Sequence, residues 1–453
     1  MHPRRIPAAM TAERDVIVVG AGFAGLACAQ RLASANVDFL VLEASDRIGG
    51  RALTTTTVAP GFPLELGALM IHGKRVVTHA WLRELGLHAV RLPTMQTARF
   101  VRDGRVARFA RLALPFHPTF GTRAFWQAVR GVPRDIRRYG GPDMSLAEFL
   151  ENEDVLPGAR EIVTLLRAHA AAAEPDEVGI LGHAEEDRAA QEEFGYSNFR
   201  LVEGYSALVG RRAGPCADRI LRSRIVTGIR WSDAGVRLTA RVNGSPEEHR
   251  AKRAILTVPL GALKAGAIAF EPPLPEAKRR AIEAIGFGAA MVIQMRFASL
   301  DPMRRLGDFG ILSGGGASTF HRAYVRARGA PPVLAAFVVG REARRRADMT
   351  DAEALRATLE ELESIVPEAR RLGAVVAAEI ARWPADPFVR GGYSFLRVHA
   401  RLAHRTALAA PVDGVLFFAG EATHDRGEAQ TVHGAIETGY RAANEAIASL
   451  APA

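Results

Sequence analysis

The clearest pattern of hydrophobic positions lies near the start of the chain. An apolar run at residues 16–19 leads into a glycine motif, G-x-G-x-x-G, at residues 20–25. A helix-like pattern follows, and then a second apolar run at residues 39–42 that ends at the acidic residue Glu43. This order predicts a strand, a tight turn, a helix and a second strand. In such a unit the glycines let the backbone approach a pyrophosphate and the acid binds a ribose hydroxyl, so the pattern indicates a dinucleotide-binding unit.

Hydrophobic periodicity predicts further elements along the rest of the chain. Residues 76–193 are expected to be largely helical and irregular. Beyond them, alternation and apolar runs predict strands at 224–231, 236–242, 254–258, 290–297, 333–339 and 415–419, and helices at 351–365 and 432–450. An apolar strand that ends in glycine is thus predicted near the C-terminus as well as near the N-terminus. We therefore expect a discontinuous dinucleotide-binding domain with a second domain inserted in two pieces.

Length and charge narrow the class of protein. The 453 residues are too many for one compact core, so two domains are expected. The net charge of +10 rests almost wholly on arginines, which are scattered and match no nucleic-acid-binding motif. The two cysteines, Cys28 and Cys216, indicate neither a disulfide framework nor a metal site, and no apolar run is long enough for a transmembrane anchor. We expect a bacterial, cytoplasmic protein that binds no nucleic acid.

Two further segments carry candidate chemistry. Residues 43–51 add a second glycine pair and two arginines that could brace a diphosphate. Near the C-terminus lie the segments 417–424 and 431–435, and a helix beginning near Thr431 would direct its positive end at a bound group. In a flavoprotein that target is the pyrimidine edge of the isoalloxazine, where negative charge collects on reduction.

A set of motifs extends across almost the whole chain: GAGFAGL, LEASDRIGGR, ELGALMIHG, TVPLGAL, RWPADPFVRGGYSF and FFAGEATH…TVHGA. In these motifs the chain resembles the flavin-containing amine oxidase superfamily of the monoamine oxidase, polyamine oxidase and lysine-specific histone demethylase type. The resemblance implies an α/β (α+β) fold, with a Rossmann-like FAD-binding domain (GR2, p-hydroxybenzoate hydroxylase-like) and an inserted substrate domain of mixed sheet and helices. The FAD-binding domain is expected at 12–75, 201–285 and 405–453, and the substrate-binding domain at 76–200 and 286–404.

The resemblance also implies roles for individual residues. Tyr393 matches the aromatic residue that walls the substrate site, and His72 matches a histidine beside the substrate. We expect these two residues, Thr431 and the position of Val292 to form the catalytic site, without a metal. The implied FAD contacts are Gly20, Gly22, Ala24, Gly25, Glu43, Ala44, Arg47, Gly50, Arg51, Gly67, Ala68, Leu69, Met70, Val226, Gly420, Glu421, Thr431, Val432 and Ala435.

Four positions depart from the family pattern. Gly392 replaces the cysteine that attaches flavin in monoamine oxidases, so FAD is expected to be bound non-covalently. Thr431 replaces a second aromatic residue, which predicts a more open site. Met70 replaces the arginine that binds the substrate carboxylate in L-amino-acid oxidases, which argues against α-amino acids. Val292 replaces a lysine that holds a water at flavin N5 and assists the reaction with oxygen, and Gln294 is a candidate neutral donor for that water.

The reaction implied by the resemblance is oxidation of a C–N bond. Hydride transfer from a primary or secondary amine to flavin N5 gives an imine, which hydrolyses to an aldehyde or ketone, while O2 is reduced to H2O2. Two alternatives stay open because of Val292: an FAD-dependent amine dehydrogenase or desaturase with a non-oxygen acceptor, and a catalytically silent flavoprotein. The expected partners are a small-molecule amine and O2 or another acceptor, and a homodimer is possible.

Overall fold

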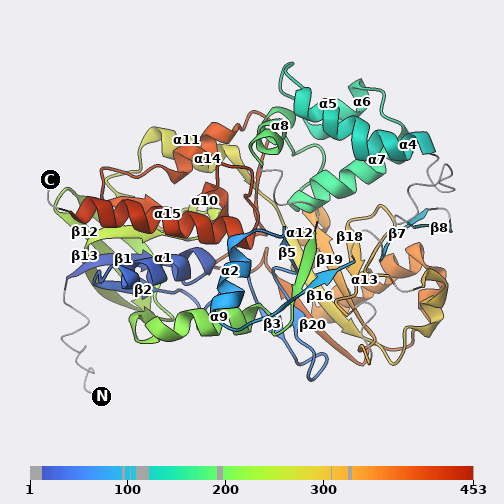
Figure 1. Cartoon of the computed structure of the whole chain (residues 1–453), viewed down its shortest axis with the longest axis horizontal. Helices are drawn as coiled ribbons and strands as arrows, with labels where there is room; N and C mark the ends of the chain where they lie inside the picture. Colours follow the sequence, from blue (N-terminus) through green and yellow to red (C-terminus); the bar gives the residue numbers. More distant parts are fainter. Residues whose placement is uncertain are drawn as a thin grey trace.

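Two large β-sheets lie side by side, with helices packed against both (Figure 1). This arrangement is that of a computed structural model, which describes residues 13–93, 97–102, 104–108, 122–190, 197–307, 309–324 and 329–451. Within these ranges no helix is both long and apolar enough to cross a membrane. The same ranges contain no group of three or more His, Cys, Asp or Glu side chains that could hold a metal ion.

The first sheet joins strands that are far apart in the sequence. Its order is β10–β2–β1–β13–β12–β11–β14, and β22 pairs with the last residues of β13. The pairs around β1 are parallel and buried on both faces, which explains why these strands are continuous apolar runs. The bounds are β1 (Arg14–Val19), β2 (Phe39–Leu42), β10 (Ile220–Leu221), β11 (Ile225–Ser232), β12 (Gly235–Val242), β13 (Ser245–Leu256), β14 (Ala269–Glu271) and β22 (Leu416–Phe418).

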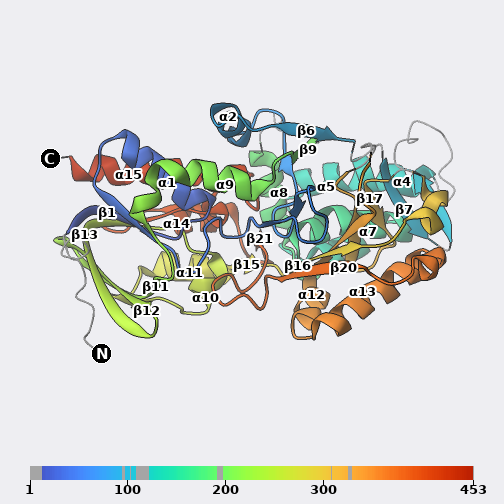
Figure 2. The same cartoon turned by 90° about the horizontal axis from the view of Figure 1, so that it is seen from below.

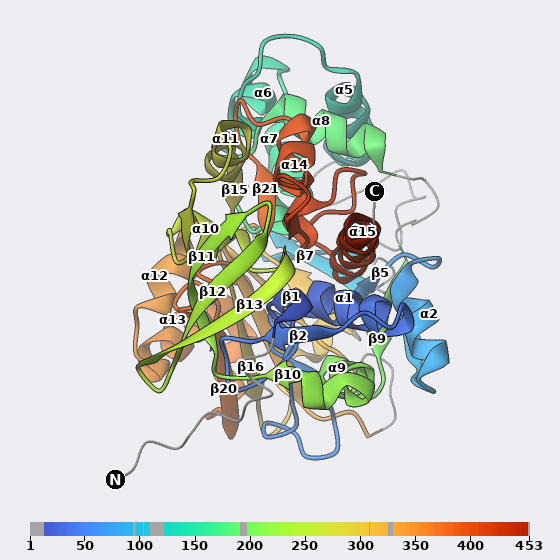
Figure 3. The same ribbon diagram turned by 90° about the vertical axis from the view of Figure 1, so that its left-hand side faces the viewer.

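Helices from the two ends of the chain pack together on this sheet. These are α1 (Phe23–Ser34) and α15 (Val432–Leu450), which lie side by side in Figure 3. Only small residues allow this approach, because a Cβ at Gly439 would lie 2.3 Å from the carbonyl oxygen of Ala24. The thiol of Cys28 donates to the carbonyl of Gly439 at 3.2 Å, and this cysteine is buried and free. Cys28 therefore contributes to helix packing.

The second sheet has the order β20–β16–β19–β18–β17–β7–β8. Its bounds are β7 (Ala98–Arg102), β8 (Arg105–Arg108), β16 (Ala290–Arg296), β17 (Ile311–Ser313), β18 (Ser318–His321), β19 (Val333–Val339) and β20 (Ala377–Arg382). Alternate residues of β16, such as Met291 and Ile293, pack into one core with α12 (Gly340–Ala347) and α13 (Asp351–Ile365). Val292 lies between them in the sequence and therefore faces the opposite side, toward the first sheet.

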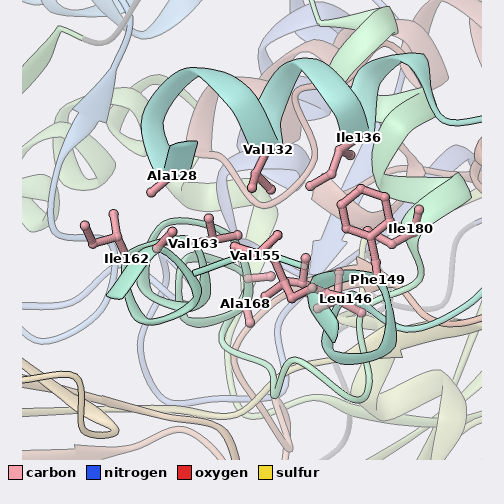
Figure 4. Packing of buried hydrophobic residues seen from close by; sticks show 14 of the residues in the cluster. Ala128, Val132, Ile136, Leu146, Phe149, Val155, Ile162, Val163, Ala168 and Ile180 are labelled. Carbon is pink, nitrogen blue, oxygen red and sulfur yellow. The ribbon is translucent and has the colours of Figure 1, made fainter. Parts of the chain in front are cut away.

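A group of helices lies beside the second sheet and has its own core (Figure 4). It contains α4 (Thr122–Trp126), α5 (Val132–Arg138), α6 (Leu146–Asn152), α7 (Pro157–Val163) and α8 (Ile180–Ala189), with π-helical turns at Gln127–Gly131 and Thr164–Ala168. Residues 76–193, expected to be largely helical and irregular, also contain strands β6 (Ala89–Leu92), β7 and β8, which the sequence did not predict. These strands are short and rich in arginine, so no alternating apolar pattern marks them.

The remaining elements connect these parts. They are β3 (Thr54–Thr55), β4 (Leu64–Glu65), β5 (Ile71–His72), α2 (Val77–Glu84), β9 (Asn198–Leu201), α9 (Tyr205–Ala213), α10 (Leu260–Lys264), α11 (Glu276–Ala284), β15 (Ile285–Phe287), β21 (Ser394–Leu396) and α14 (Leu402–Ala409). Helix α2 and strands β6 and β9 lie along one edge of the molecule (Figure 2). Trp81 of α2 packs with Phe23 of α1 and Ile436 of α15, which ties residues after 76 to the first sheet. The domain boundaries stay a prediction.

Candidate active site

A cavity of about 830 Å³ lies between the two sheets. On one side it is lined by the N-terminal ends of α1 and α15 and by the carboxyl ends of β1 and β2. On the other side it is lined by residues of β16, β18 and β19 and by the segment 387–393. The carboxyl ends of parallel strands are where α/β sheets bind nucleotides, so the first side is a candidate cofactor cradle.

The glycine motif opens the start of α1 toward the cavity. Gly20 has φ +105°, a conformation that side chains other than glycine rarely adopt. A Cβ at Gly25 would lie 1.9 Å from the carbonyl oxygen of Gly20, so only glycine allows this crossing of helix and strand. Helix α1 begins after Gly22 without a side-chain cap and without an acidic residue in its first turn. Its first N–H groups are therefore open to an anion such as a pyrophosphate.

Glu43 lies at the end of β2 and is 8% exposed. Its carboxylate accepts hydrogen bonds from the backbone N–H groups of Ala21, at 2.6 Å, and Ser45, at 2.9 Å. Burial raises the pKa of Glu43, and these two N–H groups oppose that rise. Each carboxylate oxygen keeps acceptor capacity, so the pair of oxygens can take the two hydroxyls of a ribose.

A buried ion-pair network lies between the cradle and the segment that carries Tyr393. Arg51 Nη1 donates to Glu421 Oε1 and to the carbonyl of Gly392, each at 2.8 Å. Glu421 also accepts from the hydroxyl of Ser394 at 2.6 Å, and Arg405 donates to that hydroxyl at 2.7 Å. Burial disfavours the charged carboxylate of Glu421, but Arg51, Ser394 and Arg405 outweigh it, so the pKa of Glu421 lies below its ordinary value.

The N-terminus of α15 reaches the same cavity. Thr431 is its N-cap: the hydroxyl accepts from the N–H of Gly434 at 2.9 Å and donates to the carbonyl of Glu428 at 2.7 Å. Thr431, Val432 and Ala435 all line the cavity. The positive end of a 19-residue helix is therefore directed at whatever the cavity holds.

The cavity brings together most residues that the sequence singled out. The lining includes Gly20, Gly22, Ala24, Glu43, Ala44, Gly50, Arg51, Gly67, Ala68, Leu69, Met70, Val226, Gly420, Glu421, Thr431, Val432 and Ala435, together with His72, Val292 and Tyr393. Gly25 and Arg47 are not part of the lining. Gly25 serves the crossing of α1 and β1, and Arg47 donates to the carbonyl of Ala52 and lies 5.6 Å from the ring centre of Trp383.

Tyr393 and its neighbours form the wall opposite the cradle. The hydroxyl of Tyr393 donates to the carbonyl of Ala170 at 2.9 Å, which fixes the ring, and burial raises its pKa. Tyr393 and Phe337 both pack against the buried residues Ala172, Ala290 and Val339. Val292 is fully buried and lines the cavity from β16. This wall is apolar and aromatic.

His72 and Gln294 differ in their relation to the cavity. His72 Nδ1 lies 2.7 Å from Asn198 Oδ1, and burial lowers the pKa of His72 although Asn198 opposes this. The imidazole thus favours the neutral form at the cavity wall. Gln294 is outside the lining, and its amide nitrogen donates to the carbonyl of Glu65 at 2.8 Å. Gln294 therefore does not take the place of the missing lysine.

Sequence reasoning missed the residues that line the deeper wall. Among them are His169, which follows the π-helical turn Thr164–Ala168, and Thr319 and His321 of β18. Phe337 belongs to a strand that the sequence did predict, and alternation places it on the same face as Val339. Nothing in the sequence shows that this face lines a cavity, because that depends on how the two sheets meet.

Fold and site together define a nucleotide-binding protein whose Rossmann-like cradle opens onto an apolar pocket. The chain belongs to the family of flavin-containing amine oxidoreductases: the family described as "Flavin containing amine oxidoreductase" matches residues 23–447. The sequence is 32% identical over 457 residues to "Lysine-specific histone demethylase 1 homolog 2" of Arabidopsis thaliana, covering 96% of this chain and 58% of that protein. It is 28% identical over 462 residues to "Polyamine oxidase 4" of Oryza sativa subsp. japonica, covering 95% and 88%. The chain thus spans little more than half of the demethylase-type relatives.

Two solved structures have a closely similar fold. A putrescine oxidase bound to putrescine superposes with a TM-score of 0.81 at 22% identity, covering 97% of this chain and 100% of that one. Cyclohexylamine oxidase from Brevibacterium oxydans IH-35A gives 0.81 at 23% identity with the same coverage. The predicted family, the mixed α/β fold and FAD as the cofactor are confirmed. The bacterial source and the cytoplasmic location stay predictions.

The residues of the cradle fit FAD. The uncapped start of α1 suits the pyrophosphate, Glu43 suits a ribose, and the start of α15 suits the end of the flavin ring that gains negative charge. Gly420, with φ +123°, has no atom within 4 Å of where a Cβ would lie, so the backbone leaves open space there. At residue 392 the chain carries glycine, which offers no sulfur for a covalent link.

Proposed function

We propose that this protein oxidises the C–N bond of a primary or secondary amine to an imine, which water then hydrolyses to an aldehyde or ketone. The observation that carries the proposal is that one cavity contains both the FAD cradle and the apolar wall around Tyr393. Bound FAD would supply the acceptor for the hydride of the substrate's α-carbon.

The residues of the wall orient the amine. Tyr393 is anchored on Ala170, and Phe337 packs against the same buried residues and lines the same cavity, so both rings can hold an alkyl or aryl chain against the cradle. The wall excludes water and favours the neutral amine, which is the form whose nitrogen lone pair can assist loss of the α-hydrogen. His72, whose Nδ1 lies 2.7 Å from Asn198 Oδ1 at the cavity wall, is a candidate acceptor for the proton of an incoming ammonium.

The valine at position 292, where the family pattern has a lysine, supports a second candidate function. All four lysines of the chain lie outside the cavity lining, and Lys278 is engaged by the carbonyls of Ala407, Leu408 and Ala410 at the end of α14. A site without a lysine near the flavin supports an amine dehydrogenase or desaturase with a non-oxygen acceptor as the alternative.

The two functions are separated by one experiment. The purified holoprotein is mixed with a panel of amines, and flavin bleaching without oxygen and peroxide formation in air are measured. Bleaching with peroxide supports the oxidase, and bleaching without peroxide supports the dehydrogenase. The absence of both across the panel would contradict amine oxidation.

A further inference from the structure

Helix α8 carries two adjacent acidic residues, Glu186 and Asp187, that are not among the described residues of the cavity lining. Successive residues of an α-helix point about 100° apart, so the two carboxylates leave the helix in different directions. Each of them binds a different arginine, Arg405 in one case and Arg167 in the other. These two ion pairs lead to the two sides of the cavity.

Glu186 is joined to the cofactor cradle through Arg405. The side chain of Arg405 is fully buried, and its Nε donates to Glu186 Oε1 at 2.6 Å. Its Nη1 donates at 2.7 Å to the hydroxyl of Ser394, and this hydroxyl donates to Glu421 Oε2 at 2.6 Å. Three consecutive hydrogen bonds therefore join α8 to the buried carboxylate of the cradle.

The contacts of Arg405 indicate more than a contribution to folding. Its Nη2 is buried and has no hydrogen-bond partner among the described residues. An unpartnered buried donor lowers the stability of the fold, and buried ion pairs as a class contribute little net stability. Arg405 does supply a fixed positive charge beside Ser394 and Glu421. The position of Glu421 therefore depends on Arg405, whose own position depends on Glu186.

Asp187 is joined to the other side of the cavity through Arg167. Arg167 Nη1 lies 2.8 Å from each carboxylate oxygen of Asp187 and 3.0 Å from Nε2 of His183. Burial and the neighbouring Arg167 lower the pKa of His183, so its imidazole is neutral and accepts a hydrogen bond from the guanidinium. His183 also belongs to α8, so two side chains of this helix hold Arg167.

Arg167 lies in the π-helical turn Thr164–Ala168. Such turns are rare and are frequently found at functional sites. This turn and the two residues after it contribute to the cavity lining Leu165, His169 and Ala170. The carbonyl of Ala170 also accepts the hydrogen bond from the hydroxyl of Tyr393. The position of this part of the pocket wall therefore depends on α8 through Arg167.

Helix α8 itself is closely packed, since a Cβ at Gly182 would lie 2.5 Å from the carbonyl oxygen of Ala400. We propose that Glu186 and Asp187 are positioning residues that couple the FAD cradle to the pocket wall. Glu186 acts on the cradle through Arg405, and Asp187 acts on the wall through Arg167. This inference goes beyond the proposed function, because it holds whichever reaction the site performs.

A double-mutant cycle on the holoprotein tests the coupling. It compares the wild type, Glu186→Gln, Asp187→Asn and the double variant, and the rise in flavin fluorescence after dilution gives the rate of FAD release. Glu186→Gln leaves the buried charge of Arg405 without a carboxylate partner and is expected to speed release about tenfold or more. Asp187→Asn is expected to speed release about threefold in the wild type but not further in Glu186→Gln, because coupled residues act non-additively. Multiplicative effects, or no effect of Asp187→Asn, would overturn the inference.

Hydrogen exchange of the holoprotein measures the coupling in the opposite direction. Glu186→Gln is expected to speed amide exchange in residues 164–171 about threefold or more, although Glu186 binds Arg405 rather than this segment. Asp187→Glu keeps the carboxylate and is expected to stay within about twofold of the wild type in both measurements. Exchange in residues 164–171 that is unchanged in Glu186→Gln would contradict the coupling.

A control and a second variant complete the test. Arg188 also belongs to α8, but its Nη1 donates to the carbonyl of Arg137 on α5, so Arg188→Met is expected to leave FAD release unchanged. If Glu186→Gln does not fold, Ser394→Ala breaks the same connection, and the same faster exchange in residues 164–171 is expected. A lower melting temperature without either effect on the opposite side of the cavity would show a purely structural role and overturn the inference.

Discussion

The hydroxyl of Tyr393 donates a hydrogen bond to the backbone carbonyl of Ala170 at 2.9 Å, which joins the segment after the second sheet to the helical group. The aromatic ring that faces the cofactor cradle is thus held by a residue of the 3-10 turn His169–Ala171. This hydrogen bond directly links the Tyr393 side chain to the backbone next to His169.

Removing this hydroxyl is expected to weaken substrate binding without loss of FAD. Tyr393→Phe keeps the ring and loses one hydrogen bond, worth about 1 kcal/mol, so KM for a substrate amine is expected to rise about fivefold while FAD stays bound. Steady-state kinetics and the flavin spectrum measure this. Tyr139→Phe is the control, because the hydroxyl of Tyr139 donates to the carbonyl of Pro142 at the same distance, outside the cavity. An equal change in KM for both variants would argue against the role of Tyr393.

Glu421 is expected to be essential to the stability of the cradle. Glu421→Gln leaves the charge of Arg51 without its carboxylate partner, whereas Arg405 keeps its ion pair with Glu186, and the cost is expected to be about 3–5 kcal/mol in the free energy of unfolding. Glu445→Gln removes a partly exposed pair with Arg441 and is expected to cost less than about 1 kcal/mol. Urea unfolding at pH 7 compares the two variants. Similar losses would contradict the role of the network.

The same carboxylate gives a pH dependence with a definite sign. The folded pKa of Glu421 lies below its ordinary value of 4.5, so its contribution to stability is present above pH 4.5 and is lost as the pH falls below that value. The gap in unfolding free energy between the wild type and Glu421→Gln is therefore expected to shrink as the pH is lowered from 6 toward 4. A gap that stays constant over this range would contradict the shift.

Two glycine-to-alanine changes are expected to act in opposite directions. A Cβ at Gly25 would lie 1.9 Å from the carbonyl oxygen of Gly20, so Gly25→Ala is expected to destabilise the fold by about 1–3 kcal/mol or more and to weaken FAD binding. Gly210, inside α9 and exposed, has no atom within 4 Å of the same position. Gly210→Ala is expected to stabilise by about 0.5–1 kcal/mol. Thermal unfolding with and without FAD measures both.

Val292→Lys tests whether the missing lysine limits the reaction with oxygen. The side chain of residue 292 lines the cavity, so the amine introduced there would lie in the flavin pocket, where an ammonium can stabilise negative charge. We expect the rate of reoxidation of the reduced flavin by O2 to rise at least about tenfold. Val292→Met lengthens the side chain without a charge and is expected to leave the rate unchanged. An unchanged rate in Val292→Lys would count against this role.

The sequence predicted the cradle better than the pocket, for a physical reason. The cradle depends on backbone conformation and on short motifs: Gly20 and Gly420 have positive φ, and Glu43 ends a buried strand. Such constraints leave a local signature. The pocket depends on which face of β16, β18 and β19 meets the first sheet, and His321 and Phe337 are ordinary strand residues until that packing is known. His169 follows a π-helical turn that no periodicity in the sequence marked.

Strand β13 pairs with β1 along one edge and with β22 along the other, so strands from both ends of the chain are hydrogen-bonded to the same strand. The start of α1 and the start of α15 line the same cavity. During synthesis, the part of the cradle around α1 is therefore made early, and the part around α15 is made only when almost the whole polypeptide has been synthesised. The complete cradle therefore requires the residues at the start of α15 as well as those at the start of α1.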